Sequence, residues 1–330
     1  MLTLLQEQAL LNLASKSYPA FTSYFKLKKE NLEHYIQHKF LPYIVKQYEE
    51  LNLSTTVLFR SQRQNISDIY VPLTLTDLGG HEIQCKIDQF PTNLISENPK
   101  ILISDNAGMG KSTLLKMIFR YAIDSGTCIP IYIDLKSLIK SDVVIDIDKY
   151  LIDVFPSFTK VPSERFVQHN LENNSYLFLF DGADEVPEKF KGSVFNSINK
   201  FTGKCKLSRF IIATRDEERI KSSFLSFLNL KIRPLNKNEA YKLIRNCNID
   251  SINPNDLIKE IEKPENRAVL EFLTNPLLTT LLYTAYVYKR TIPLKKSLFY
   301  KQIYDALYEA HDATKPGYFF REKKCGLHIT

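Results

Sequence analysis

The sequence predicts an α/β fold in which a five-stranded parallel sheet carries helices on both faces, follows a helical leader and precedes a helical lid domain. Between Lys100 and Pro234, short apolar runs alternate with segments of helix length, a pattern typical of parallel strands joined by crossover helices. Beyond Pro234 these runs stop, and apolar residues recur at helical spacing. The 330 residues, 44% hydrophobic and 25% charged, suffice for two or three packed units and exclude disordered and fibrous classes.

The apolar runs place the five strands and the lid helices along the chain. The expected strands are 101–104, 129–135, 176–180, 210–214 and 230–234. The expected lid helices are 238–246, 268–272, 277–288 and 297–310. The stretch IYVPLTL at 69–75 predicts a further strand, and LGGHEI after it predicts a turn and a short extended segment. The regions that result are a helical N-terminal segment at 1–60, a sheet domain at 61–235 and a lid domain at 236–310.

Composition bounds the compartment and the partners. Five cysteines lie far apart without a C-x-x-C pair, which argues against a disulfide framework or a zinc site and favours a reducing, cytoplasmic setting. The N-terminus lacks the layout of a signal peptide, and the longest uncharged stretch, 272–288, is too short for a membrane span. Residues 286–330 hold nine Lys or Arg against four acids. Such a basic end can bind nucleic acid, but a solvated face is the simpler interpretation.

A glycine-rich loop stands between the strand ILIS and an amphipathic helix. Its sequence matches the second half of the Walker A pattern at Gly108, Gly110, Lys111 and Ser112. Backbone N–H groups of such a loop surround phosphates, the lysine contacts the terminal phosphates and the hydroxyl binds Mg²⁺, so ATP or ADP and Mg²⁺ are the expected cofactors. A chance glycine-rich helix cap is the alternative. The residues expected at the nucleotide are Ala107, Gly108, Met109, Gly110, Lys111, Ser112 and Thr113.

The loop departs from the pattern at its first position, because Asp105 stands where the pattern has a glycine. Aspartate and asparagine tolerate left-handed backbone conformations. We therefore expect Asp105 and Asn106 to make the turn that starts the loop. Whether this departure weakens nucleotide binding stays open at this point.

Acidic residues follow the strand YLFLF later in the chain. Asp181 ends the strand, and Asp184 and Glu185 come shortly after it. Acids at the carboxyl end of a parallel strand face the ligand crevice of an open α/β sheet. Asp181 is expected to bind Mg²⁺ together with Ser112, while Glu185 or Asp184 orients and deprotonates the attacking water. A solvated acidic turn is the alternative.

One later feature points to the same crevice, and another is an ordinary helix start. The strand FIIAT is followed by Arg215, whose guanidinium is expected to contact the γ-phosphate, with an ion pair to the acidic residues 216–218 as the alternative. Asn275 and Pro276 begin a long apolar helix, because proline is tolerated in the first helical turn.

Taken together, these motifs resemble the NACHT family of STAND P-loop NTPases in order and spacing. The resemblance covers residues 65–315 and rests on AGMGKSTLL at 107, LFLFDGADEV at 177, FIIATR at 210, IRPLNKNEA at 232 and FLTNPLLTTLL at 272. Its most specific part is DGADE. The resemblance implies that strand 210–214 lies between the Walker A strand and the strand of Asp181. It also implies that Pro276 packs against the adenine and that 69–73 lies near the base.

Members of this family are switches. ADP holds a closed monomer, and exchange for ATP lets opened chains assemble and activate an effector. The resemblance implies slow, regulatory ATP hydrolysis, self-association on activation, an unidentified trigger and effector, and a place in bacterial antiphage or innate immune defence. It also implies that 311–330 begins a truncated winged-helix or linker region, in which neither His311 nor His328 has an assigned role. An AAA+-like motor that remodels nucleic acid or protein is the alternative function, and a binding module with an inactive pocket is a third.

Overall fold

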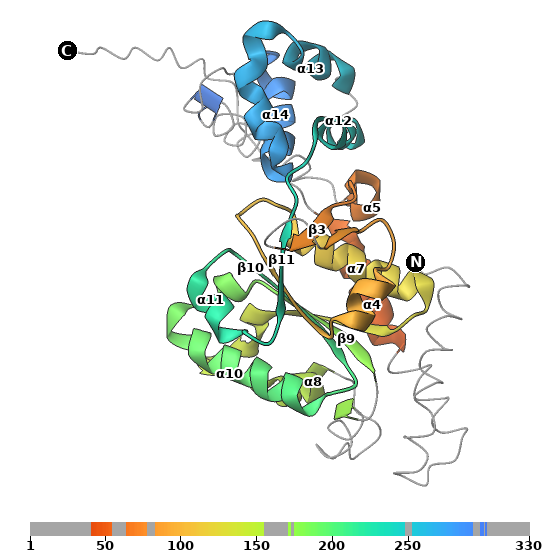
Figure 1. Ribbon diagram of the computed structural model, residues 1–330, viewed down its shortest axis with the longest axis vertical. Coiled ribbons are helices and arrows are strands. Elements are labelled where there is room, and N and C mark those ends of the chain that lie inside the picture. The colour runs from red at the N-terminus through yellow and green to blue at the C-terminus, as the bar shows by residue number, and fades with distance from the viewer. Residues whose placement is uncertain are drawn as a thin grey trace, which may run out of the picture.

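The computed structural model describes residues 41–54, 64–77, 83–154, 171–172, 175–247, 253–292, 298–299 and 301. A sheet domain and a helical lid make up this part of the chain. In Figure 1 the lid helices gather at one end, and the last central strand leads from the sheet toward them. Most of the expected leader at 1–60, most of the helix at 297–310 and all of 311–330 lie outside the described residues.

The centre of the fold is a seven-stranded sheet, and its five parallel strands are those predicted from the apolar runs. Their bounds are β5 Lys100–Ser104, β6 Ile129–Asp134, β9 Tyr176–Asp181, β10 Arg209–Thr214 and β11 Leu228–Ile232. The spatial order is β4-β3-β11-β5-β10-β9-β6. Strand β10 pairs in parallel with both β5 and β9, which confirms its implied position between them. The carboxyl ends of these three strands therefore meet at one edge, where an open sheet binds its ligand.

The other two strands are antiparallel, so the prediction of a five-stranded, wholly parallel sheet is incomplete. Strand β3 (Thr74–Asp77) pairs with β11 and with β4 (Gln84–Lys86). These two strands extend the sheet beyond β11, at the end of the sheet opposite β6.

The strand expected at 69–75 is wrong in its bounds. Ile66–Ile69 forms the short helix α5, whose N-cap Asn65 accepts a hydrogen bond from the Ser67 backbone N–H. Strand β3 starts only after Leu73. The side chains of Tyr70, Val71 and Leu73 are buried although their backbone is in no strand, so the apolar run reflects burial rather than sheet pairing.

Helices cover both faces of the sheet. Figure 1 shows α7 on one face with α4 outside it, and α8, α10 and α11 on the other. The bounds are α4 Leu41–Asn52, α7 Lys111–Ser125, α8 Ile147–Val154, α10 Glu188–Lys204 and α11 Glu218–Ser223. This distribution follows from right-handed crossovers between parallel strands. Aromatic rings fill the layer between the central strands and α10, namely Phe178, Phe180, Phe201 and Phe210.

Short elements connect the larger ones. They are β1 Leu53–Ser54, β2 Gln64–Asn65, α6 Thr92–Glu97, β7 Ile139–Lys140, β8 Val143–Val144 and the 3-10 helices η2 Leu135–Leu138 and η3 Ala183–Glu185. Two of them, η2 and η3, follow β6 and β9 directly and lie beside each other, because those strands are neighbours in the sheet.

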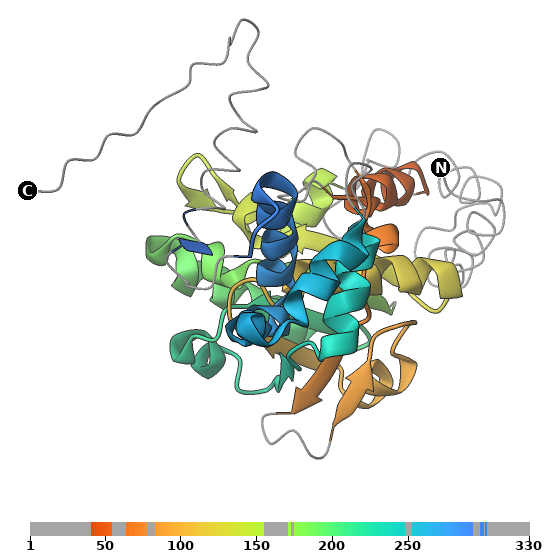
Figure 2. The ribbon, with the colours of Figure 1, turned by 90° about the horizontal axis from the view of Figure 1, so that it is seen from above.

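The lid begins after β11. Its elements are α12 Lys237–Asn246, α13 Pro254–Ile261, the 3-10 helix η4 Pro264–Thr274 and α14 Pro276–Lys289. Figure 2 looks down on the lid, with α12 and α14 in front of the sheet domain. The sequence prediction missed α13, and the α-helix expected at 268–272 is part of η4. Among the helices that the structure describes, none combines the length and apolar character needed to cross a membrane.

Candidate functional site

The phosphate loop, residues 105–110, is held at both ends by regular structure, because it joins β5 to α7. Gly108 and Gly110 have φ values of 81° and 89°, in the left-handed region that favours glycine. A Cβ at Gly108 would lie 2.8 Å from Cβ of Leu277, and one at Gly110 would lie 3.0 Å from Cδ1 of Leu73. Both backbone conformation and close neighbours therefore require glycine at these positions.

Asp105 and Asn106 start the loop without the left-handed backbone conformation that both residue types tolerate. Among the described residues other than glycine, those with positive φ are Ser141, Asp142 and Arg290. The Asp105 carboxylate instead accepts hydrogen bonds from the backbone N–H groups of Asn106, at 2.7 Å, and Ile232, at 2.8 Å. The Walker A pattern has a conformationally free glycine at this position. Here the Asp105 side chain instead fixes the start of the loop by accepting two backbone hydrogen bonds.

Lys111 is the first residue of α7, and its ammonium lies beside the loop. Nζ donates hydrogen bonds to the backbone carbonyls of Asp105, at 2.7 Å, and Asn106, at 2.8 Å. Partial burial lowers the pKa of Lys111, because desolvation disfavours the charged form. Phosphate oxygens next to Nζ would stabilise the ammonium through charge-assisted hydrogen bonds. The position of Lys111 therefore suits an anionic ligand.

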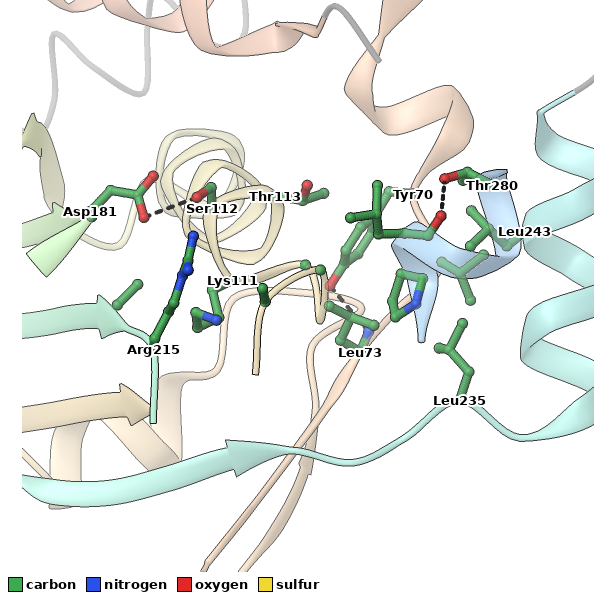
Figure 3. A pocket seen from close by; sticks show the side chains of 18 of the residues that line it. Tyr70, Leu73, Lys111, Ser112, Thr113, Asp181, Arg215, Leu235, Leu243 and Thr280 are labelled. Atoms are coloured by element: carbon green, nitrogen blue, oxygen red, sulfur yellow. Dashed lines mark hydrogen bonds between the residues drawn. The ribbon is translucent and has the colours of Figure 1, made fainter. Parts of the chain in front are cut away.

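Asp181 ends β9, and its two carboxylate oxygens have separate partners. Oδ1 accepts a hydrogen bond from Ser112 Oγ at 3.0 Å, and Oδ2 accepts one from the Tyr132 hydroxyl at 2.5 Å. Figure 3 shows the contact with Ser112. Burial raises the pKa of Asp181. A hydroxyl and a carboxylate side by side are oxygen ligands of the kind that Mg²⁺ uses alongside phosphate and water, so they fit the expected metal.

Tyr132 is a site residue that the sequence did not predict. It lies on β6, whose parallel pairing with β9 brings its hydroxyl to Asp181. We expect Tyr132→Phe to weaken divalent metal binding about tenfold, because groups that orient a metal-binding carboxylate commonly contribute that much affinity. Manganese titration of the ADP-bound protein, followed by electron paramagnetic resonance, measures this. Tyr121→Phe, a partly buried tyrosine on α7, is the control, and equal affinities for both variants would contradict a positioning role for Tyr132.

The two acids that follow Asp181 lie in different surroundings. The Asp184 side chain is 9% exposed, and its oxygens accept hydrogen bonds from Nε and the backbone N–H of Arg215, both at 2.9 Å. Glu185 is 47% exposed and pairs through Oε2 with Lys136 Nζ at 2.5 Å. Glu185 is therefore better placed to take a proton from water, whereas Asp184 holds Arg215.

Arg215 points into the crevice rather than along the acidic segment that follows it. Its side chain rises from the end of β10 toward Ser112 in Figure 3. The alternative pairing with residues 216–218 is not the one that the structure gives, because Arg215 pairs with Asp184. Asp216 pairs instead with Lys221 and Lys231, each at 2.8 Å.

One pocket of about 410 Å³ collects most of these groups, and its volume lies in the range of small-molecule sites. Its polar end is lined by Lys111, Ser112, Thr113, Asp181, Asp184, Glu185 and Arg215. Its apolar end is lined by Ile69, Tyr70, Val71, Leu73, Leu235, Leu243, Pro276 and Leu277. In Figure 3 the labelled Lys111, Ser112, Asp181 and Arg215 lie on one side, and Leu73, Leu235 and Leu243 lie on the other. This arrangement suits the phosphates and the base of a nucleotide.

Most of the predicted site residues line this pocket, but Met109 does not, and several lining residues were not predicted. Ala107, Gly108 and Gly110 of the loop also line the pocket. Met109 does not, because its side chain is buried and its sulfur receives a hydrogen bond from Asn275 Nδ2 at 3.5 Å. Residues of the lid and its linker that line the pocket without having been predicted are Leu235, Leu243, Leu277 and Thr280. In the sequence they are indistinguishable from the ordinary apolar and polar residues of the lid helices and the linker before them.

The fold and the pocket together define a class of protein. A phosphate loop between a strand and a helix, with an acid at the end of a strand two places away in the sheet, is the arrangement of a P-loop NTPase domain. Residues 100–251 match the family model of the NACHT domain. This segment of the chain is a NACHT domain, a P-loop NTPase domain of the STAND type.

Comparison with curated protein sequences found no match. Among solved structures, domain III of the Thermotoga maritima replication initiation protein DnaA aligns at 17% identity and a TM-score of 0.36, over 66% of this chain and 88% of that chain. The Aeropyrum pernix Orc1 protein in complex with DNA aligns at 15% and 0.37, over 64% and 59%. AMPPCP-bound DnaA from Aquifex aeolicus aligns at 13% and 0.33, over 67% and 86%.

Proposed function

We propose that this chain is a signalling switch of the NACHT type, which binds ATP, hydrolyses it slowly and alternates between an ADP-bound closed form and an ATP-bound open form. The observation that carries the proposal is direct contact between the lid and the phosphate loop. Asn275 Nδ2 donates to the Ala107 carbonyl at 3.1 Å, and the Leu277 backbone N–H donates to the Gly108 carbonyl at 3.2 Å. A change in the phosphates bound by the loop would therefore act directly on the start of α14.

The pocket residues support hydrolysis of the terminal phosphate. Glu185 takes the proton of the attacking water while the water oxygen bonds to the γ-phosphorus and ADP leaves with the bridging oxygen. Lys111 and Arg215 stabilise the charge on the phosphate oxygens. Ser112 and Asp181 would hold Mg²⁺, which neutralises phosphate charge when bound.

The proposal extends to partners and to the compartment. We infer self-association on activation, with the trigger and the effector on other segments or other molecules, in bacterial antiphage or innate immune defence. This part rests on the NACHT domain and on the resemblance of the chain to that family. A reducing, cytoplasmic setting is supported by the thiols of Cys85, Cys128, Cys205 and Cys247, which form no disulfide.

The test is the nucleotide that the purified protein carries, released by denaturation and identified by chromatography, together with turnover in Mg²⁺ and ATP. Near-stoichiometric ADP and turnover far below the enzymatic median of about 10 per second would support a switch. A site that purifies without nucleotide and turns over rapidly when nucleic acid or unfolded protein is added would instead indicate a motor.

The ion pair between Lys136 and Glu185 gives a further prediction. Lys136→Met should raise the hydrolysis rate about two- to fivefold, because the ion pair directs the Glu185 carboxylate toward Lys136 Nζ. The expected increase is small, because an exposed ion pair contributes at most about 1 kcal/mol. Lys140→Met is the matched control, since Lys140 forms a similarly exposed pair with Asp153 and does not line the pocket. Single-turnover hydrolysis measures both variants. A rate that falls in Lys136→Met would mean that Lys136 assists the reaction instead.

A further inference from the structure

The Asp105 carboxylate connects the phosphate loop to the chain that enters the lid. The residue is 7% exposed, and each carboxylate oxygen accepts one backbone N–H, from Asn106 at 2.7 Å and from Ile232 at 2.8 Å. The Asp105 backbone N–H donates to the Thr214 carbonyl at 3.3 Å. A glycine at this position has no side chain to bond Ile232. The contact is therefore a consequence of the residue in which this chain departs from the Walker A pattern.

Ile232 is the last residue of β11, where the chain leaves the sheet for the lid (Figure 1). The linker that follows is fixed by three contacts. The Arg233 backbone N–H donates to the Thr74 carbonyl at 2.8 Å, and its guanidinium pairs with Glu239 of α12 at 2.6 Å. The Leu235 backbone N–H donates to the Thr274 carbonyl at 2.9 Å. Asp105 thus holds the sheet end of a linker that is bonded to β3, to α12 and to the end of η4.

The lid also contacts the other end of the same short loop. Asn275 and Leu277 bond the carbonyls of Ala107 and Gly108, as described above, while Asp105 bonds the linker. The four residues 105–108 therefore contact both the end of β11, where the linker to the lid begins, and the start of α14. If the linker moved away, one oxygen of a buried carboxylate would lose its partner, which is costly enough to change the conformation of the loop.

We propose that Asp105 is a positioning residue that couples the position of the lid to the conformation of the phosphate loop, and so sets the preference of this chain for ADP over ATP. This inference rests on the proposed switch function, in which ADP accompanies the closed lid. Coupling between two sites is reciprocal, so a residue that transmits lid position to the loop also transmits the nucleotide state to the lid.

The test compares the affinities of the full chain for ADP and for a non-hydrolysable ATP analogue by titration calorimetry. We expect Asp105→Gly to weaken ADP binding about tenfold and ATP-analogue binding less than about threefold, because in the proposed coupling the Ile232 contact stabilises the closed, ADP-bound form. Ser104→Ala is the matched control. Ser104 is buried one residue earlier and donates to Asn229 of β11 at 2.6 Å, so it connects the same two strands without reaching the linker. It should keep the wild-type ratio of affinities.

A second variant separates positioning from a general structural role. Asp105→Asn keeps one side-chain acceptor, so its ADP affinity should lie between those of the wild type and Asp105→Gly. Hydrogen exchange at the Ile232 amide should be faster in both variants. Equal weakening for the two nucleotides, or unchanged exchange at Ile232, would overturn the coupling while leaving the proposed function in place. A wild-type protein that binds neither nucleotide would overturn the proposed function itself.

Discussion

Replacing Lys111 by alanine is expected to abolish nucleotide binding, with a loss of affinity of at least about 100-fold for both ADP and ATP. The physical reason is the position of the ammonium at the start of α7, next to the loop that would surround the phosphates. Each charge-assisted hydrogen bond to a phosphate contributes about 1.5–3 kcal/mol, and Nζ can donate more than one. Partial burial adds to the effect, because the ammonium regains from phosphate oxygens the solvation that it has lost.

Titration calorimetry with ADP measures the loss, and circular dichroism shows whether the variant remains folded. Lys100→Ala is the matched control. Lys100 lies at the opposite end of β5, where its ammonium is 5.7 Å from the centroid of the Phe227 ring. Its removal should leave nucleotide affinity unchanged. Undiminished ADP binding by Lys111→Ala would remove the phosphate site from this loop.

The sheet could be predicted from the sequence because its central strands are buried on both faces. Strands β9 and β10 read as nearly continuous apolar runs, and their side chains are almost fully buried. The order of these strands in the sheet could not be predicted in the same way. Nothing in the apolar runs placed β10 between β5 and β9, and only the family resemblance implied it. Helix α13 was missed although Asn253 and Pro254 give it an ordinary N-cap and first turn.

In the site, too, the residues of local motifs could be predicted from the sequence, whereas contacts between distant segments could not. The loop glycines, Lys111 and the acids of DGADE follow from local sequence, because strand, loop and helix are consecutive. The contacts of Tyr132 with Asp181 and of Lys136 with Glu185 depend on how β6 is aligned with β9, where Asp134 lies opposite Asp181. That register is set by packing between segments that are distant in the chain. No local sequence motif at Tyr132 or Lys136 indicates this register.

Replacing Glu185 by glutamine is expected to reduce hydrolysis at least about 100-fold while leaving ADP and ATP affinity within about threefold of the wild type. Glutamine keeps the shape of the side chain and an oxygen that accepts a hydrogen bond from Lys136, but it cannot take a proton from water. The variant should therefore retain ATP, and if ATP opens the chain it should also shift the protein toward oligomers. Single-turnover hydrolysis and light scattering measure the two effects.

Two further variants test whether the base is Glu185 itself. Glu188→Gln is the matched control, because Glu188 is a 60% exposed acid on α10 that pairs with Lys191 and does not line the pocket. It should hydrolyse ATP at the wild-type rate. Lys136 is expected to act only through the Glu185 carboxylate. Adding Lys136→Met should therefore raise the hydrolysis rate of the wild-type protein but not that of the Glu185→Gln variant. An unchanged rate in Glu185→Gln would transfer the role to Asp184 or to neither acid, and acceleration in the double variant would show that Lys136 acts on hydrolysis by another route.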